Sequence, residues 1–231
     1  MYKRQTNWRR EYFPNYKHGR RKDRKASKLD WGSIFDTLHL IKQELQDNFP
    51  YKVLEVENAE ADDIIASVVS YVAQAPSHYE KVLIVSGDKD FIQLQKHSFV
   101  TQYSPTLKKF VNGIDPHAYI KEHILKGDRS DGVPNFLSPD NCFVDEMRQR
   151  PISKKKMATW IDLEPEDFCN EEMLRNYQRN RTLIDLEYAP DEINQACVQA
   201  YLNSTVKNRS GLLNYFIKHR LKNHMENIGD F

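Results

Sequence analysis

KVLIVSGDKDFIQ, residues 81–93, is the stretch of sequence that decides the fold. Its β-branched apolar run predicts a strand that stops at Ser86 and Gly87, and two carboxylates, Asp88 and Asp90, follow at once. Ligand sites in open α/β sheets lie outside the carboxyl ends of the strands, and paired carboxylates hold a hard cation such as Mg²⁺ or Mn²⁺. An ordinary loop, in which Asp88 caps a turn and Asp90 is solvated, explains the same residues. The choice depends on how many other acids converge here.

Two further groups of carboxylates occur at predicted element ends. One opens a helix predicted in ENAEADDIIASVVSYVAQ, residues 57–74, where negative charge also complements the helix dipole. The other lies in KGDRSDGVPN, residues 126–135, whose glycines and proline predict a tight turn. Capping or a polar loop explains each group singly, but together they predict acids converging on divalent cations. The seven candidate metal ligands are Glu60, Asp62, Asp63, Asp88, Asp90, Asp128 and Asp131.

Charge is distributed unevenly along the chain. The formal net charge is +1, yet residues 1–28 carry eleven Lys or Arg against Glu11 and Asp23, which leaves this segment at about +9 and the remainder at about −8. A basic arm on an acidic body indicates a polyanionic partner for the arm and a cation site in the body. Aromatic residues interleave with the basic ones, a composition suited to phosphate contacts and base stacking. A solvated basic tail has the same composition.

Several protein classes are excluded by composition. The three cysteines, Cys142, Cys169 and Cys197, are scattered, odd in number and without zinc spacing, which indicates buried thiols in a reducing cytoplasm. The most apolar run, residues 64–73, is too short to span a bilayer, and no signal peptide is visible, so no membrane partner is expected. Neither a nucleophile motif nor a Gly-rich phosphate loop is present. Metal-assisted phosphodiester hydrolysis, in which two ions about 4 Å apart activate water and stabilise the leaving oxygen, requires many carboxylates and little else.

The hydrophobic periods alternate between helix and strand and so predict an α/β fold. Asp30 and Asp115 are placed to cap two of the helices, and Pro116 stands at the first position of the second. The predicted strands are 51–56, 81–85, 99–103 and 109–111. The predicted helices are 29–48, the helix opening at 60, 91–96, 116–125, 153–160, 170–184, 190–202 and 211–228.

Three motifs carry a family resemblance. EADD at 60–63, SGDKDF at 86–91 and KGDRSDGVPN at 126–135, in this order and spacing, resemble the structure-specific 5′ nucleases, which comprise flap endonucleases and the 5′ to 3′ exonuclease domains of bacterial polymerases. Within that family the chain is most similar to the ribonucleases H of T-even bacteriophages, from about Trp8 to Phe231. The resemblance implies a PIN-like α/β sheet with helices on both faces.

The same resemblance implies a division into three segments. A basic, helical arch segment would occupy residues 1–28, the α/β nuclease core residues 29–125, and a helix-three-turn-helix motif with a helical C-terminal domain residues 126–231. The family's N-terminal strand, which carries a metal-binding aspartate, and a second metal aspartate before the arch have no counterpart in this sequence. The resemblance therefore implies an incomplete core and metal site, and leaves the activity of the isolated chain uncertain.

Roles for individual residues also follow from the resemblance. Lys17 and Arg20 match the arch lysine and arginine that contact the scissile phosphate in the family, and join Asp88 and Asp90 as candidate catalytic residues. Three lysines near the second half of the turn motif would contact the duplex backbone. A solvated charge run is the commoner meaning of such lysines and explains the same residues. The candidate nucleic-acid-binding residues are Arg9, Arg10, Tyr16, Lys17, Arg20, Arg21, Lys154, Lys155 and Lys156.

The expected function is a nuclease of phage DNA replication in the bacterial host cytoplasm. It would use two Mg²⁺ ions, or Mn²⁺ in their place, to remove RNA primers and 5′ flaps from DNA and RNA–DNA hybrids in flap or forked duplexes. A single-strand binding protein, or an upstream polypeptide that supplies the missing strand, would be its partner. A non-catalytic DNA-binding module or one half of a split nuclease is the alternative. A toxin-type small ribonuclease is a weaker one, since the 126–135 turn and the helical C-terminal region count against it.

Overall fold

The computed structural model describes residues 7–74 and 81–231, with only the backbone described at Arg21. The chain forms two compact units, whose boundaries differ from those of the three predicted segments. One unit comprises residues up to Asp23 together with Val56–Val198, and the other comprises Arg24–Glu55 together with Gln199–Phe231. All seven candidate acids belong to the first unit.

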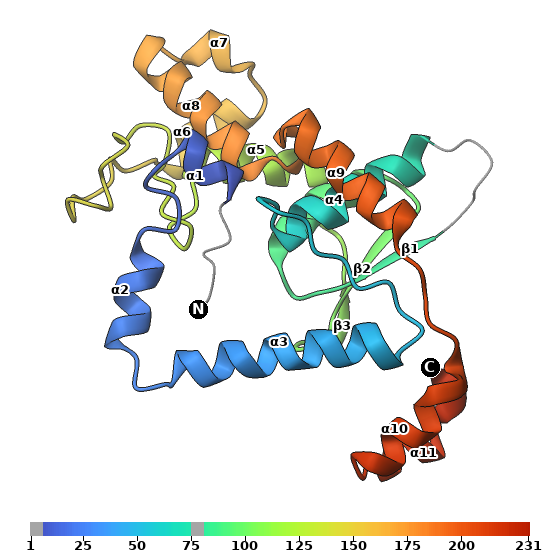
Figure 1. Cartoon of the computed structure of the whole chain (residues 1–231). Helices are drawn as coiled ribbons and strands as arrows, with labels where there is room; N and C mark the ends of the chain where they lie inside the picture. The colour runs from blue at the N-terminus through green and yellow to red at the C-terminus, as the bar shows by residue number, and fades with distance from the viewer. Residues whose placement is uncertain (1–6, 75–80) are drawn as a thin grey trace. The chain divides into compact units, whose positions relative to one another are not determined.

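A small sheet lies within the first unit (Figure 1). Strand β1, Val82–Val85, pairs in parallel with β2, Val100–Ser104, and β2 pairs antiparallel with β3, Lys109–Val111. The predicted strands at 81–85, 99–103 and 109–111 are therefore confirmed, as is the α/β class. On β1, Leu83 and Val85 point to a face where they are 53% and 61% exposed.

The opposite face of the sheet is buried. Ile84 and Val100 pack there against α4, Ala61–Gln74, and against the 3₁₀ helix η1, Lys89–Lys96. This packing buries Ala66 and Val69 of α4, and it fixes the helix start beside the carboxyl end of β1. The buried members of the cluster are Ala66, Val69, Ile84, Phe91, Leu94, Val100 and Leu186.

Among the remaining helices of the first unit, α5 begins at its predicted start signal. Asp115 caps α5 by accepting a hydrogen bond from the backbone N–H of His117, with Pro116 at the first position. Ser153 caps the predicted basic helix in the same way. The helices α2 and α9 run on into the second unit. The elements are α1 Trp8–Tyr12, α2 Gly19–Ala26, α5 Pro116–Lys126, α6 Lys154–Ile161, α7 Pro165–Phe168, α8 Glu171–Ile184, η2 Leu186–Tyr188 and α9 Asp191–Asn203.

The second unit packs around Phe49, Leu212 and Phe216. Its longest helix, α3, is capped as predicted by Asp30. A single helix over 211–228 was predicted, but the chain leaves the helical conformation at Arg220, whose φ is 55°, and two short helices result. The elements of this unit are α3 Trp31–Asn48, η3 Arg209–Gly211, α10 Leu212–Lys218, α11 Lys222–Glu226 and η4 Ile228–Asp230.

The predicted strand at 51–56 is wrong. A strand requires a hydrogen-bonded neighbour along its length, and among the described residues the nearest pairing is an isolated parallel bridge between Asn7 and Asn58, beyond the segment's end. Among the helices of the described ranges, none combines the length and the apolarity that a membrane span requires.

Candidate functional site

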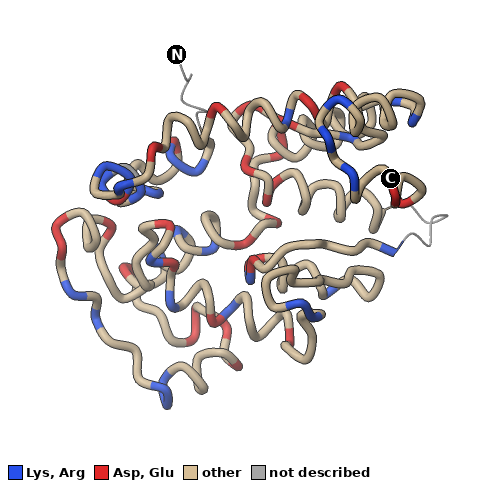
Figure 2. Tube along the Cα trace, turned by 90° about the horizontal axis from the view of Figure 1, so that it is seen from below, with Lys and Arg blue, Asp and Glu red and all other residues tan. Residues whose placement is uncertain are grey.

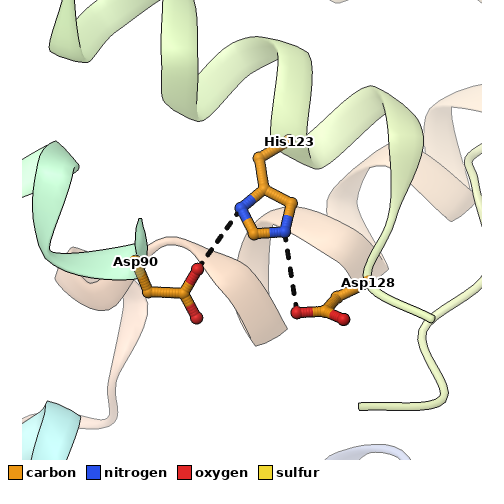
Figure 3. Close-up of side chains that lie close together, drawn as sticks. All are labelled: Asp90, His123 and Asp128. Atoms are coloured by element: carbon orange, nitrogen blue, oxygen red, sulfur yellow. Dashed lines mark ion pairs between the residues drawn. The ribbon is translucent and has the colours of Figure 1, made fainter. Parts of the chain in front are cut away.

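Three side chains meet at the carboxyl-terminal side of the sheet. Asp90 lies in the first turn of η1, His123 in the last turn of α5, and Asp128 in the turn that follows α5. The imidazole lies between the two carboxylates, with Nδ1 3.5 Å from Asp90 Oδ1 and Nε2 3.7 Å from Asp128 Oδ2 (Figure 3). One potential ligand atom from each residue lies within 4.8 Å of the other two, which suits a shared metal ion.

His123 was not among the predicted site residues. A single histidine on a helix carries no motif of its own. The available signal was its spacing: it stands one helical turn before Gly127, the residue that ends α5 and begins the acidic turn.

Local backbone geometry explains why these side chains converge. Asp88 caps η1 by accepting a hydrogen bond at Oδ1 from the N–H of Asp90, 3.1 Å away. Gly127 ends α5 with φ 67°, and a Cβ at this position would lie 2.4 Å from the carbonyl oxygen of Val133. Only glycine therefore fits here, and the chain turns at once into Asp128.

Electrostatics in this cluster are dominated by closely spaced carboxylates. Burial, and then the nearby charge of Asp88, raise the pKa of Asp90 to about 6, although His123 opposes the shift. Burial, Glu60 and Asp88 likewise raise the pKa of Asp62 to about 6. These acids therefore carry negative charge that lacks a full counter-charge, and a divalent cation would stabilise their ionised forms.

The imidazole and the turn carboxylate shift one another. Burial alone would lower the pKa of His123, but Asp128 and Asp90 raise it overall. For Asp128, burial is outweighed by hydrogen bonding from His123 and Ser130, so its pKa is held well below the usual range. Within the described part of the chain, His123 Nδ1 is buried without a hydrogen-bond partner. An orphaned ring nitrogen beside carboxylates is a donor set that fits a divalent metal ion.

A second pair of acids, Glu60 and Asp131, adjoins the first cluster. The buried hydroxyl of Tyr16 lies 2.8 Å from Glu60 Oε2 and 2.7 Å from Asp131 Oδ2. Lys17 pairs with Glu60 and lies 3.5 Å from Asp131 Oδ2, while Arg20 Nη2 lies 2.7 Å from Asp131 Oδ1. The two basic residues predicted to contact the scissile phosphate are therefore placed directly beside the predicted metal ligands.

Both groups of residues open onto one groove of about 450 Å³, hereafter the acidic groove. Five of the seven predicted acids line it, together with both predicted phosphate contacts. Glu60 lies next to the groove and is connected to it through Lys17. The lining includes Lys17, Arg20, Asp62, Asp88, Asp90, Tyr119, His123, Asp128, Arg129 and Asp131.

Arg9 and Asp63, two other predicted site residues, lie outside the acidic groove. Asp63 is 0% exposed and Arg9 2% exposed, and two contacts of 2.8 and 2.9 Å join guanidinium and carboxylate. Trp8 Nε1 and the N–H of Glu60 also donate to Asp63, and Arg9 Nε donates to the carbonyl of Leu183. These contacts leave neither side chain available for metal or nucleic acid. They instead join α1 to the start of α4 and the end of α8.

The other predicted nucleic-acid contacts are distributed over the first unit. Arg10 is exposed, and Lys154, Lys155 and Lys156 are exposed on the first turn of α6, none of them among the described residues that line the acidic groove. The side chain of Arg21 lies outside the described residues. Basic residues dominate α2, with the sequence GRRKDRKA, and the Lys and Arg positions are blue in Figure 2.

Known proteins match the whole length of the chain. Residues 1–124 match the family described as 5′-3′ exonuclease, N-terminal resolvase-like domain, and residues 115–231 match the family described as T4 RNase H, C terminal. Ribonuclease H of Enterobacteria phage T4 is 34% identical to the chain over 231 residues, which cover 97% of this chain and 75% of the relative.

Two further comparisons concern shorter or more distant matches. Flap endonuclease Xni of Shewanella oneidensis is 31% identical over 140 residues, 57% of this chain and 49% of the relative. A crystal structure of the T5 D15 protein, co-crystallised with metal ions, superposes with a TM-score of 0.55 at 18% identity and covers 86% of this chain and 80% of that one. This likeness confirms the predicted fold class.

Proposed function

This chain belongs to the 5′-3′ exonuclease family, a family of metal-dependent phosphodiesterases, and we propose that it hydrolyses phosphodiester bonds at the acidic groove. One observation carries the proposal: five predicted metal ligands line the same groove as Lys17 and Arg20, the two basic side chains suited to binding a scissile phosphate. The family match and the retained acids favour a nuclease over a non-catalytic binding module and over a toxin-type ribonuclease.

The groove residues fit a site for two divalent cations, with Mg²⁺ as the proposed ion and Mn²⁺ as a substitute. Asp62, Asp88 and Asp90 would hold ions on one side, and Asp128 and Asp131 on the other. Bound ions would activate a water and stabilise the leaving oxygen. Lys17 and Arg20 have a separate role, because they would bind and polarise the phosphate. The carboxylates alone would repel the phosphate.

The proposed substrates are DNA and RNA–DNA hybrids with a 5′ end at a flap or fork, and the proposed process is removal of RNA primers and 5′ flaps. The names of two relatives, a ribonuclease H and a flap endonuclease, support these substrates. Exposed Arg10 and the three lysines of α6 would contact the duplex backbone and contribute affinity without sequence preference.

The test is cleavage of a 5′-labelled flap and of a 5′-labelled RNA primer on a DNA template. We expect cleavage with Mg²⁺ or Mn²⁺ and none after chelation with EDTA. Binding of the same substrates without cleavage in either metal would contradict the proposal and favour a non-catalytic module.

Lys17→Met is expected to lower the single-turnover cleavage rate by roughly 10²–10³-fold, because it removes a preorganised cation from the reacting phosphate. Metal affinity is expected not to fall, since Lys17 competes with a metal ion for Glu60. Lys25→Met, an exposed charge loss on α2, is the matched control. Equal rates for the two variants would remove Lys17 from the phosphate site.

Metal affinity is expected to depend steeply on pH, because the pKa values of Asp62 and Asp90 are both raised to about 6. Both acids must lose a proton to bind a cation, so affinity falls as the pH drops through 6, by roughly 100-fold between pH 7.5 and pH 5. Calorimetric titration with Mn²⁺ measures this, and Asp62→Asn should flatten the curve. A pH-independent affinity in the unmodified chain would contradict the assignment.

The stability of the metal-free chain should change with pH in the opposite direction to the metal affinity. Between pH 4 and pH 6 the folded chain holds these two protons more tightly than the unfolded chain, since both folded pKa values are raised. The contribution of Asp62 and Asp90 to the free energy of unfolding therefore decreases as the pH rises through this window.

A further inference from the structure

We propose that His123 is a direct ligand, through Nδ1, of the cation held by Asp90. This inference rests on the proposed function, because it concerns one of the ions in the acidic groove. It adds to that function a nitrogen ligand in an otherwise oxygen-lined site, and with it a preference among divalent metals.

The separation of the two donor atoms supports a shared ion. His123 Nδ1 and Asp90 Oδ1 are 3.5 Å apart, longer than the usual 2.9–3.0 Å of a nitrogen–oxygen hydrogen bond. Two ligands of one cation, each about 2.0–2.3 Å from it, lie about 2.8–3.3 Å apart at right angles and about 3.3–3.8 Å apart at a tetrahedral angle. The observed distance therefore suits a metal ion between the atoms better than a direct bond.

The environment of Nδ1 supports the same assignment. The His123 side chain is only 17% exposed, and Nδ1 is buried without a hydrogen-bond partner among the described residues. A buried polar atom left in this way is unfavourable unless a ligand or water satisfies it. A cation between His123 and Asp90 would supply that partner and also neutralise the carboxylate.

The second ring nitrogen is placed as in many metal-binding histidines. Nε2 faces Asp128 Oδ2 at 3.7 Å, on the side of the ring away from Asp90 (Figure 3). A metal-ligating histidine commonly presents its other nitrogen to a carboxylate, which fixes the tautomer and the ring orientation. Asp128 would thus keep the proton on Nε2 and leave the Nδ1 lone pair for the metal.

Contacts within α5 also fix the orientation of the His123 ring. Tyr119, one turn earlier on α5, packs against it edge-on with centroids 5.7 Å apart. The carbonyl of His123 accepts a hydrogen bond from the N–H of Gly127, 2.8 Å away, so the backbone is fixed at the helix end. The imidazole therefore meets the cation without reorientation.

A nitrogen ligand has a consequence for metal choice. Imidazole suits Zn²⁺, Fe²⁺ and Ni²⁺, whereas Mg²⁺ and Mn²⁺ favour carboxylate, carbonyl and water oxygens. Replacing His123 should therefore weaken Zn²⁺ binding by about 10–100-fold, a loss like that seen when groups supporting a metal ligand are removed, and should change Mg²⁺ binding much less.

The test is pulsed electron paramagnetic resonance of the full chain loaded with Mn²⁺, which detects a directly coordinated ¹⁴N nucleus. We expect the nitrogen coupling in the unmodified chain and in His117→Gln, an exposed histidine on the same helix, and its loss in His123→Gln. The spectrum of the unmodified chain tests the proposal even if His123→Gln fails to fold. Calorimetry with Zn²⁺ and Mg²⁺ on the same variants tests the change in metal preference.

The outcomes separate this inference from the proposed function. If Asp90→Asn abolishes Mn²⁺ binding but the unmodified chain shows no nitrogen coupling, His123 is not a ligand of that ion. Flap cleavage by the same chain would still support the nuclease assignment. Absence of Mn²⁺ binding together with absence of cleavage would overturn both.

Discussion

Asp90→Asn is expected to abolish flap cleavage, lowering the rate by about 10³-fold or more. The substitution keeps the size of the side chain but removes the charge that lies between Asp88, His123 and Asp128 in the acidic groove. A bound metal ion supplies several kcal/mol of transition-state stabilisation, and each 1.4 kcal/mol lost is about tenfold in rate. Single-turnover cleavage at saturating Mg²⁺ measures the effect.

The matched control for this substitution is Asp167→Asn, an exposed residue on α7 of the same unit. Its rate should equal that of the unmodified chain, while Mn²⁺ affinity should fall in Asp90→Asn alone. A similar rate in both variants would show that Asp90 holds no catalytic ion and that the reaction takes place elsewhere on the protein.

Arg9→Ala is expected to destabilise the protein by about 3–5 kcal/mol, because it leaves Asp63 as an uncompensated charge with no exposure to solvent. It also removes the donor to the carbonyl of Leu183, at the end of α8. Urea unfolding should show a lower midpoint, and the neighbouring exposed Arg10→Ala should leave the midpoint nearly unchanged.

A double substitution tests whether the loss comes from the stranded charge. Arg9→Met with Asp63→Leu replaces the ion pair by apolar groups and should recover most of the stability, since buried ion pairs contribute little more than well-packed hydrophobic residues. If the double variant is less stable than Arg9→Ala, then the hydrogen bonds to Trp8, Glu60 and Leu183, rather than charge compensation, are what hold these segments together.

Local signals predicted much of the fold. Asp30, Asp115 and Pro116 mark helix starts that the structure confirms, since capping depends on a few neighbouring residues. The strand before Ser86 was predicted from its apolar run, and the rule for ligand sites in α/β sheets then indicated that separate acids meet there. The break in the helix at Arg220 was missed because a left-handed arginine has no sequence signature.

The candidate site was predicted less completely than the fold. The roles of Arg9 and Asp63 depend on a contact across 54 residues, which no local pattern reveals. The charge of Arg9 led to the prediction that it binds nucleic acid, whereas in the structure it is buried and paired with Asp63. His123 was missed for a related reason: its spacing from Gly127 places it at the end of α5, but its nearness to Asp90 depends on how α5 lies relative to η1.

The turn between Gly127 and Val133 has a mechanical consequence. Asp128 at one end faces His123, while the carbonyl of Asp131 accepts a hydrogen bond from the N–H of Lys17, 2.6 Å away. A Cβ at Gly132 would lie 3.0 Å from the carbonyl of Asn15, so the two segments meet backbone to backbone. We therefore expect the two segments to move together. A displacement of the segment that leads into α2 would then also displace the turn that carries Asp128 and Asp131.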